Sequence, residues 1–483
     1  MSLKDQAVGG VKWNGVGTAT VALLQMLKLF IVARFISKSD FGLLAIATMV
    51  LGFTEIFANM GLATGLIHKQ DISRKQYSSV FWLNLLLSCA VYAILCAATP
   101  LVSNYYHESE LNKIIPLIGL QLIISSFGKM FYTFKSKELD FKFISIVSIV
   151  STLLGAILTV LLAVRGLGVY SIVYGTLLQV VVMQGTYAVS GLRKYRIMFH
   201  FKPSEITDLF KIGGYQLGMQ VIDYMAAKAD IFLIGRFFGQ ELLGVYNLAK
   251  ELVMKVVQVI NPMITSVAAP AFAKFQDDKE RMRISYRKIL NILSFLNVPV
   301  FAILFVFADP LTLLCYGQDK MAVAWFVRAL SLWGLFQSVG NPAGILMVAL
   351  GRTDLGFYWT LVRATFTMFI TYVACQFDIH ILAYSQVVLS FVFVFAYWRM
   401  VVYKMIRLPL SDYLAPMAFP VIASVIAAIV SGIATYWVNN VYISMLIILL
   451  FGIIYMLIYR LFKYDYIKTI FFMVFKKGGG SNL

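Results

Sequence analysis

Basic side chains occur at places where an apolar sequence should tolerate them least. Seven of the 41 Lys and Arg residues fall well inside long apolar stretches, not between them. These seven are Lys28, Lys129, Lys228, Lys250, Lys255, Arg328 and Arg363. A buried cation is costly, by about 2.5–3.5 kcal/mol at the centre of a membrane helix, so it usually faces a polar cavity or an ionic partner. The chemistry that such residues offer is recognition of an anion, because Lys and Arg make charge-assisted hydrogen bonds to phosphate and carboxylate oxygens.

Acidic side chains are fewer in the same stretches. They are Glu55, Asp223, Asp230 and Glu251. Glu251 precedes Lys255 by four residues, a spacing at which the two could simply pair on one helix face. Asp223 and Asp230 are seven residues apart and share a face, so either could neutralise a nearby base. These acids therefore have both a structural and a functional interpretation.

The distance of each basic residue from the helix ends distinguishes the bases that are expected in a cavity from those that could reach the membrane surface. Lys28, Lys250, Arg328 and Arg363 lie two or more turns inside their apolar stretches, so we expect them to line a cationic cavity, with Lys255 and Lys228 as further members. Lys129 is closer to an end and could extend its ammonium group to the surface instead.

Enzymatic and metal-binding patterns are absent from the sequence. The four histidines lie in connections or near helix ends, and no zinc-protease, phosphate-loop or serine-hydrolase motif is present. Cys89, Cys96, Cys315 and Cys375 fall in apolar runs without metal or disulfide spacing. We therefore expect neither an enzyme, a metal site nor a bound cofactor.

The elements that must position the charged residues follow from composition. Of the 483 residues, 60% are hydrophobic and only 13% are charged, which indicates a chain surrounded by lipid. Helices satisfy their own backbone in lipid, so the sequence predicts an all-α, polytopic membrane protein. About fourteen runs are long enough to span, near residues 13–36, 41–66, 77–102, 112–134, 141–164, 167–190, 212–237, 242–268, 287–314, 321–350, 355–376, 379–401, 411–438 and 440–462.

The distribution of Lys and Arg predicts the orientation. With a cytoplasmic N-terminus, 28 of these residues fall in inside connections and 6 in outside connections. Cytoplasmic connections of membrane proteins are enriched in Lys and Arg, so we expect both termini in the cytoplasm. The same distribution accounts for most of the net charge of +18 without a nucleic-acid partner.

An internal repeat divides the chain. Residues 32–47 align without gaps on residues 234–249, with Arg34 on Arg236 and Gly42 on Gly244 at an offset of 202. We read the two arginines as architectural. The repeat predicts an N-terminal six-helix bundle (1–205), a second six-helix bundle (206–408), an extra helix pair (409–465) and a tail (466–483) that ends in a linker-like sequence. Pro262, Pro299 and Pro342 are expected to interrupt helices of the second bundle.

Several short sequence motifs, which follow one another in a fixed order along the chain, resemble those of a known family. They are Gly10-Val-Lys-Trp13, Ala33-Arg34, Phe41-Gly-Leu-Leu44, Lys137-Glu-Leu-Asp-Phe141, Tyr246-Asn-Leu-Ala249, Asn261-Pro-Met-Ile-Thr265, Pro270-Ala-Phe-Ala-Lys274, Gln276-Asp-Asp278 and Ser338-Val-Gly-Asn-Pro342. The chain resembles the polysaccharide transporter branch of the multidrug/oligosaccharidyl-lipid/polysaccharide exporter superfamily. Within that branch it is most similar to the colanic-acid exporter group.

The resemblance implies a V-shaped fold like that of multidrug transporters, with two bundles and an extra helix pair. It implies a flippase of the bacterial inner membrane that moves undecaprenyl-pyrophosphate-linked oligosaccharides to the periplasmic leaflet by alternating access, for surface polysaccharide synthesis. The alternative is a drug/cation antiporter of the same superfamily, although seven intramembrane bases against four acids favour an anionic substrate.

Further expectations concern ions and partners. Glu55, Asp223, Asp230 and Glu251 could couple transport to Na⁺ or H⁺, or compensate the bases. The expected partners are the lipid-linked oligosaccharide, membrane lipids and the polysaccharide polymerase machinery, with no nucleic acid, and we expect a monomer.

Overall fold

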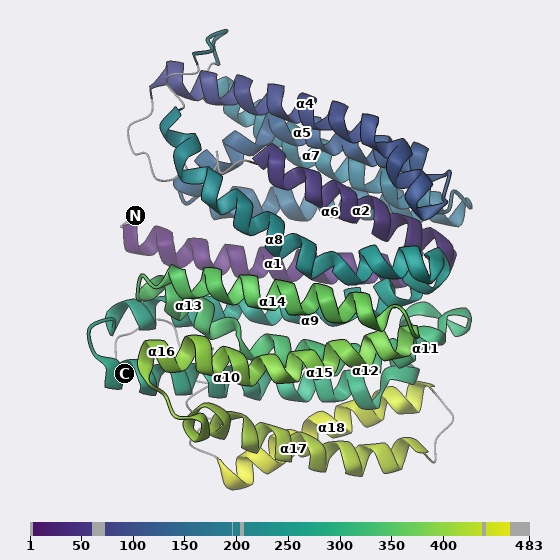
Figure 1. The fold of residues 1–483 in the computed structure, drawn as a ribbon, viewed down its shortest axis with the longest axis vertical. Helices are drawn as coiled ribbons and strands as arrows, with labels where there is room; N and C mark the ends of the chain where they lie inside the picture. Colours follow the sequence, from purple (N-terminus) through teal and green to yellow (C-terminus); the bar gives the residue numbers. More distant parts are fainter. Residues whose placement is uncertain (1–2, 60–72, 196, 203–206, 437–440, 464–483) are drawn as a thin grey trace. The chain divides into compact units, whose positions relative to one another are not determined.

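Helices are the main secondary structure of the described residues (Figure 1). The computed structural model describes residues 3–59, 73–195, 197–202, 207–436 and 441–463, and it contains no strand within them. The first helices are α1 (Leu3–Val32), α2 (Lys38–Asn59), α4 (Arg74–Tyr106), α5 (Leu111–Lys137), α6 (Phe141–Val164), α7 (Val169–Tyr195), α8 (Thr207–Phe237) and α9 (Gly239–Lys274). The others are α10 (Lys279–Val306), α11 (Ala308–Tyr316), α12 (Ala322–Val339), α13 (Asn341–Ala349), α14 (Thr353–Ala374), α15 (Ile379–Tyr397), α16 (Tyr403–Ile406), α17 (Leu410–Tyr436) and α18 (Val441–Phe462).

The length and hydropathy of these helices define a multi-pass membrane protein. Among the described residues, 11 segments are long and apolar enough to cross a membrane. Helices α8, α9 and α14 are long but are not among them, and these three helices carry most of the predicted site residues. Their charges lower the hydropathy by which spans are recognised, so the count of fourteen stays a prediction.

The chain folds as two compact units. The first, unit 1, comprises Met1–Leu248 and Thr360–Leu382, and the second, unit 2, comprises Ala249–Trp359 and Ala383–Leu483. The predicted boundaries at residues 205, 408 and 465 follow the sequence repeat instead, and they stay predictions. The predicted tail, 466–483, lies outside the described residues.

Unit 1 is built around closely packed long helices. Helix α6 packs against α1 and α7, and α5 packs against α4 and α7. Buried aromatic and aliphatic side chains, among them Phe81, Phe131 and Tyr187, fill the space between them. Glycines permit the closest approach: a Cβ on Gly155 would lie 2.7 Å from the carbonyl oxygen of Gly175, so α6 and α7 nearly touch through their backbones.

The Lys137–Phe141 stretch joins the ends of three helices. Asp140 caps α6 by accepting a hydrogen bond from the Phe143 amide, and it also pairs with Lys135 at 2.9 Å. Glu138 accepts hydrogen bonds from Lys194 and Tyr195 at the end of α7. Burial raises the pKa of Glu138, but these bonds and the neighbouring lysine charges lower it to below its ordinary value. The stretch therefore fixes α5, α6 and α7 relative to one another.

The two repeat glycines meet in a reciprocal contact inside unit 1. A Cβ on Gly42 would overlap the carbonyl oxygen of Gln240, and a Cβ on Gly244 would overlap that of Lys38. Residues 38 and 240 are themselves related by the offset of 202. A contact in which each partner uses the same two positions is typical of a two-fold relation, so it supports the sequence repeat.

Unit 2 centres on α10, which packs against α12 and α17, while α17 packs against α18. Its core contains Phe272, Tyr286 and Tyr413, and a second cluster joins Phe295 to Tyr455, whose hydroxyl donates to the Phe295 carbonyl at 3.0 Å.

Two predictions about helix continuity need correction. The apolar run 287–314 contains two helices, because α10 ends at Val306 and α11 begins at Ala308. Helices α9 and α10 continue through Pro262 and Pro299, which were expected to interrupt them. Only Pro342 lies at a break, in the first turn of α13, where its missing N–H has no helical partner to lose.

Candidate functional site

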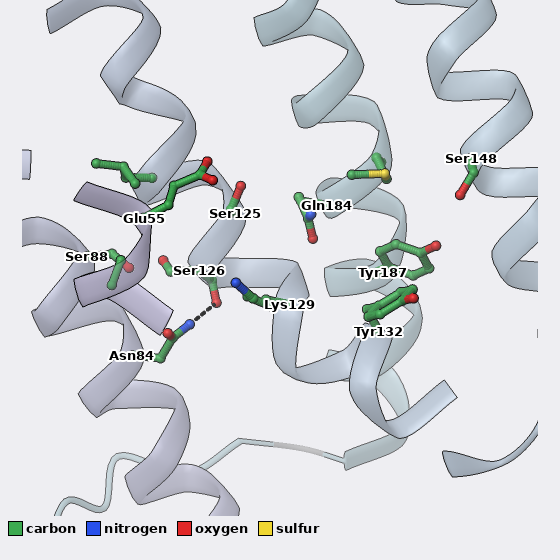
Figure 2. Close-up of a pocket in the computed structure, with 13 residues that line it drawn as sticks. Glu55, Asn84, Ser88, Ser125, Ser126, Lys129, Tyr132, Ser148, Gln184 and Tyr187 are labelled. Carbon is green, nitrogen blue, oxygen red and sulfur yellow. Dashed lines mark hydrogen bonds between the residues drawn. The ribbon is translucent and has the colours of Figure 1, made fainter. Parts of the chain in front are cut away.

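A polar cavity lies inside unit 1, between α2, α4, α5, α6 and α7 (Figure 2). Its volume is about 390 Å³, within the range of small-molecule sites. The lining residues are Glu55, Ala58, Asn84, Ser88, Leu122, Ser125, Ser126, Lys129, Tyr132, Ser148, Met183, Gln184 and Tyr187. Most of these side chains are polar, although the surrounding helices are apolar.

Helical periodicity explains why these residues face one space. Ser125, Lys129 and Tyr132 recur at intervals of four and three residues, so they form one stripe on α5. Asn84 and Ser88 are four apart on α4 in the same way. The cavity is thus formed by polar stripes on helices whose remaining faces pack against neighbours or face lipid.

Gly128 sets the distance between α5 and α7 at the cavity. A Cβ on Gly128 would lie 2.5 Å from the Gln184 carbonyl oxygen and 2.7 Å from its Cα. Those atoms are backbone and cannot move without displacing α7. The absence of a side chain therefore lets Lys129, the next residue, lie beside Gln184 in the cavity.

Opposite charges enter the cavity from two helices. Glu55 comes from α2 and Lys129 from α5, and the two interact electrostatically. Tyr224 of α8 also lies near Glu55, and its hydroxyl donates to the Met49 carbonyl at 2.8 Å. The cavity is thus lined by one acidic and one basic side chain, whose charges have opposite sign.

Neutral polar groups form the deeper part. The Asn84 side-chain amide donates to the Ser126 carbonyl at 3.2 Å, and both residues are buried (Figure 2). Gln184 is only 9% exposed, and its Oε1 atom has no hydrogen-bond partner among the described residues. Tyr132 and Tyr187 pack edge to face, with ring centroids 5.5 Å apart. The cavity therefore offers hydroxyls, amides and aromatic rings.

The predicted cavity bases of unit 1 lie elsewhere. Arg363 of α14 forms an ion pair with Asp223 of α8, with side chains that are 19% and 55% exposed. Lys28 of α1 and Lys228 of α8 are partly buried. None of these four residues lines the cavity of Figure 2.

Asp230 has a structural environment. It is buried, and its carboxylate accepts hydrogen bonds from the Tyr246 hydroxyl at 2.7 Å and from the Ile231 amide at 2.8 Å. Arg236, one of the repeat arginines, donates to the Tyr105 carbonyl at 2.7 Å and lies over the Tyr105 ring. Both residues tie α8 to its neighbours, which supports the architectural interpretation of Arg236.

The remaining predicted bases belong to unit 2. Arg328 of α12 pairs with Asp309 in α11. Lys250 of α9 is 8% exposed, and its ammonium group lies 5.7 Å from the centre of the Trp333 ring, a cation–π geometry. Glu251 and Lys255 are half-buried on the same helix. A single cavity lined by Lys28, Lys250, Arg328 and Arg363 stays a prediction.

Of the predicted site residues, only Glu55 lines the unit 1 cavity; the other lining residues are not among them. Glu55 was singled out, but Lys129 was set aside as a base that could reach the surface. The serines, Asn84 and Gln184 are absent from the predicted site, although polar residues that recur every three or four positions in apolar helices are a signal that indicates them. Within the described residues, no three His, Cys, Asp or Glu side chains gather so as to hold a metal ion.

The fold and the charged interior define a multi-pass membrane protein of the transporter type. The chain belongs to the polysaccharide biosynthesis protein family, whose pattern matches residues 31–325. It is 26% identical to the lipopolysaccharide biosynthesis protein WzxC of Escherichia coli (strain K12) over 363 residues, 75% of this chain and 74% of that protein. It is also 26% identical to the teichuronic acid biosynthesis protein TuaB of Bacillus subtilis (strain 168) over 364 residues, 74% of each chain. The resemblance noted from the sequence is confirmed.

Solved structures show the same fold. The lipid II flippase MurJ, in an inward closed conformation, matches with a TM-score of 0.79 and 13% identity, covering 94% of this chain and 99% of that one. An inward-facing multidrug resistance MATE family transporter of the MOP superfamily matches with a TM-score of 0.60 and 16% identity, covering 80% and 98%. The predicted all-helical, MATE-like fold is confirmed, and at these identities the likeness concerns the fold alone.

Proposed function

We propose that this chain is a flippase that moves undecaprenyl-pyrophosphate-linked oligosaccharide repeat units from the cytoplasmic to the periplasmic leaflet of a bacterial inner membrane. The observation that carries the proposal is membership of the polysaccharide biosynthesis protein family over residues 31–325. Relatives named for lipopolysaccharide, teichuronic acid and succinoglycan production support it, the last being a biosynthesis transport protein, ExoT of Rhizobium meliloti (strain 1021).

The charged helices suit such a substrate. A lipid-linked sugar diphosphate is an anion, and moving it across about 30 Å of hydrocarbon requires cations on the way. Lys28, Lys250, Lys255 and Lys228 supply positive charge from α1, α8 and α9. Arg328 and Arg363 would first have to exchange Asp309 and Asp223 for the substrate.

The remaining features of the proposal follow from the orientation and the acids. Both termini would be cytoplasmic, and a coupling ion, Na⁺ or H⁺, would act through Glu55, Asp223, Asp230 or Glu251. The protein would work as a monomer that passes its product to polysaccharide polymerase machinery. Antiport of cationic drugs is the weaker candidate, because likeness to MATE transporters concerns the fold alone.

Vesicles provide the test. The purified chain is reconstituted with undecaprenyl-pyrophosphate-N-acetylglucosamine, and a galactosyltransferase added outside modifies only the outer leaflet. Empty vesicles should stop at about half modification, and vesicles with the chain should approach completion. Lys250→Gln should slow the second phase about tenfold, as expected for one lost charge-assisted contact. The control Lys113→Gln removes an exposed lysine that pairs with Glu110. A second phase that is absent from wild-type vesicles would exclude flipping of this lipid.

A further inference from the structure

We propose that the polar cavity between α2, α4, α5, α6 and α7 is a saccharide subsite that holds one sugar residue of the lipid-linked substrate. The inference rests on the proposed function and deepens it, because it names a part of the substrate and the residues that select it. The diphosphate would be held by bases outside this cavity.

The size of the cavity argues for a sugar ring over a lone ion. Its volume is about 390 Å³. One water occupies about 30 Å³ in the liquid, so the space equals about a dozen waters. A desolvated ion needs a tight shell of ligands and would leave most of this space to water, whereas a pyranose ring with its substituents fits within the cavity and occupies far more of it.

The lining chemistry matches a polyhydroxylated ligand. Serine hydroxyls donate and accept hydrogen bonds, as do the amides of Asn84 and Gln184, and sugar hydroxyls require both roles. The rings of Tyr132 and Tyr187 add aromatic surface beside these groups, suited to the apolar faces of a sugar. In most small-molecule sites, a few polar groups within an otherwise apolar pocket fix the orientation of the ligand.

The charges disfavour the diphosphate as occupant. The cavity contains one base, Lys129, and one acid, Glu55, which interact with each other. An entering diphosphate would carry more negative charge than the single cation can offset, and it would be repelled by the Glu55 carboxylate. A neutral sugar has no such conflict, and it can accept a hydrogen bond from the ammonium group and donate one to the carboxylate.

The residues that line the cavity range from exposed to fully buried, so a ligand can enter from one side and reach the buried groups. Glu55 is exposed and Tyr132 is 43% exposed, so they form an open rim. Asn84, Ser126 and Gln184 are buried and form the floor. The Gln184 Oε1 atom at the floor lacks a partner among the described residues, and a buried acceptor without a partner is unfavourable. A sugar hydroxyl would satisfy it.

The experiment compares lipids with and without a sugar. The full chain in nanodiscs is titrated with undecaprenyl pyrophosphate, and with the same lipid bearing glucose, galactose or N-acetylglucosamine. The ratio of the sugar-free Kd to the tightest sugar-bearing Kd measures the contribution of the sugar. Gln184→Leu and Ser125→Ala alter the cavity. The matched control is Gln179→Leu, on the same helix, where the side chain instead bonds Thr152 at 3.1 Å outside the cavity.

We expect Gln184→Leu to lower the ratio about three- to tenfold, as for one lost hydrogen bond, while the Kd of the sugar-free lipid is unchanged. Gln179→Leu should leave the ratio as in wild type. If Gln184→Leu does not fold, Ser125→Ala decides alone. An unchanged ratio in the cavity variants overturns the subsite. The subsite is also overturned if a variant changes the Na⁺ or pH dependence of binding equally for all four lipids, because such an effect does not involve the sugar. A wild-type chain that binds every lipid equally overturns the subsite only, whereas one that binds none overturns the proposed function itself.

Discussion

Charged side chains inside the helices of this protein have specific partners. Arg363 pairs with Asp223, Arg328 pairs with Asp309, and Lys250 lies over an aromatic ring. Lys129 lines the same cavity as Glu55 and feels its charge. The sequence predicts that Arg328 and Arg363 line a cationic cavity, and neutralising an unpaired base there would relieve desolvation and cost little stability. The ion pairs reverse that expectation, because removing one partner leaves the other uncompensated.

The Arg363–Asp223 pair makes a prediction at this scale. Arg363→Gln should destabilise the protein by about 1 kcal/mol, a value reduced from that of a buried pair because Asp223 is half exposed. The double variant Arg363→Gln with Asp223→Asn should recover most of that loss. Thermal unfolding in detergent measures both variants.

Arg352, just before α14, and Asp354, in the first turn of α14, provide the control, since both are exposed and their neutralisation should have little effect. If the Arg363 variant is as stable as wild type, the ion pair contributes nothing to stability.

Glycine contacts determine how the helices approach one another. Gly128 and Gly185 are both helical glycines near the cavity, on α5 and α7. A Cβ on Gly128 would overlap the backbone of Gln184, but one on Gly185 would meet no atom within 4 Å. The same chemical change therefore has opposite consequences at the two positions.

Gly128→Ala should lower the stability by about 1–3 kcal/mol, because the added methyl group forces α5 and α7 apart. Gly185→Ala should be neutral or raise it by up to about 1 kcal/mol, since alanine favours the helix. Unfolding of the two variants under identical conditions measures the difference. Equal stability of both would show that α5 and α7 adjust without cost.

Orientation in the membrane belongs to the whole molecule. The excess of Lys and Arg on one side predicts which loops face the cytoplasm. Asn104, exposed in the last turn of α4, should lie outside, and Lys279, exposed at the start of α10, should lie inside. The two positions thus report opposite sides.

A membrane-impermeant thiol reagent tests this orientation in intact spheroplasts. In a background with Cys89, Cys96, Cys315 and Cys375 replaced, Asn104→Cys should be labelled and Lys279→Cys should not. Both should react after the membrane is permeabilised, which shows that each thiol is accessible. The reverse pattern in intact spheroplasts would invert the orientation.

Composition and local patterns were enough to predict the class of this protein. The low charge content indicates a lipid environment, and in lipid a helix satisfies its own backbone hydrogen bonds. The motifs, by their order along the sequence, indicate the family that the comparisons confirm. The offset of 202 also anticipated that Gly42 and Gly244 are equivalent, because backbone contact tolerates only glycine at both positions. Such features depend on solvent or on local geometry, which a single sequence expresses directly.

Only the tertiary structure decided which charges pair and which polar groups share a space. Asp223 and Arg363 are far apart in the sequence, and nothing in the spacing of either specifies the other. The cavity requires stripes from five helices to converge, and its position depends on the close approach at Gly128. Lys129 could reach the surface by its distance from the helix end, but the packed helices place it at the lining of the cavity together with Glu55. Pairing and enclosure arise from contacts between distant segments, so they appear only once the helices are packed.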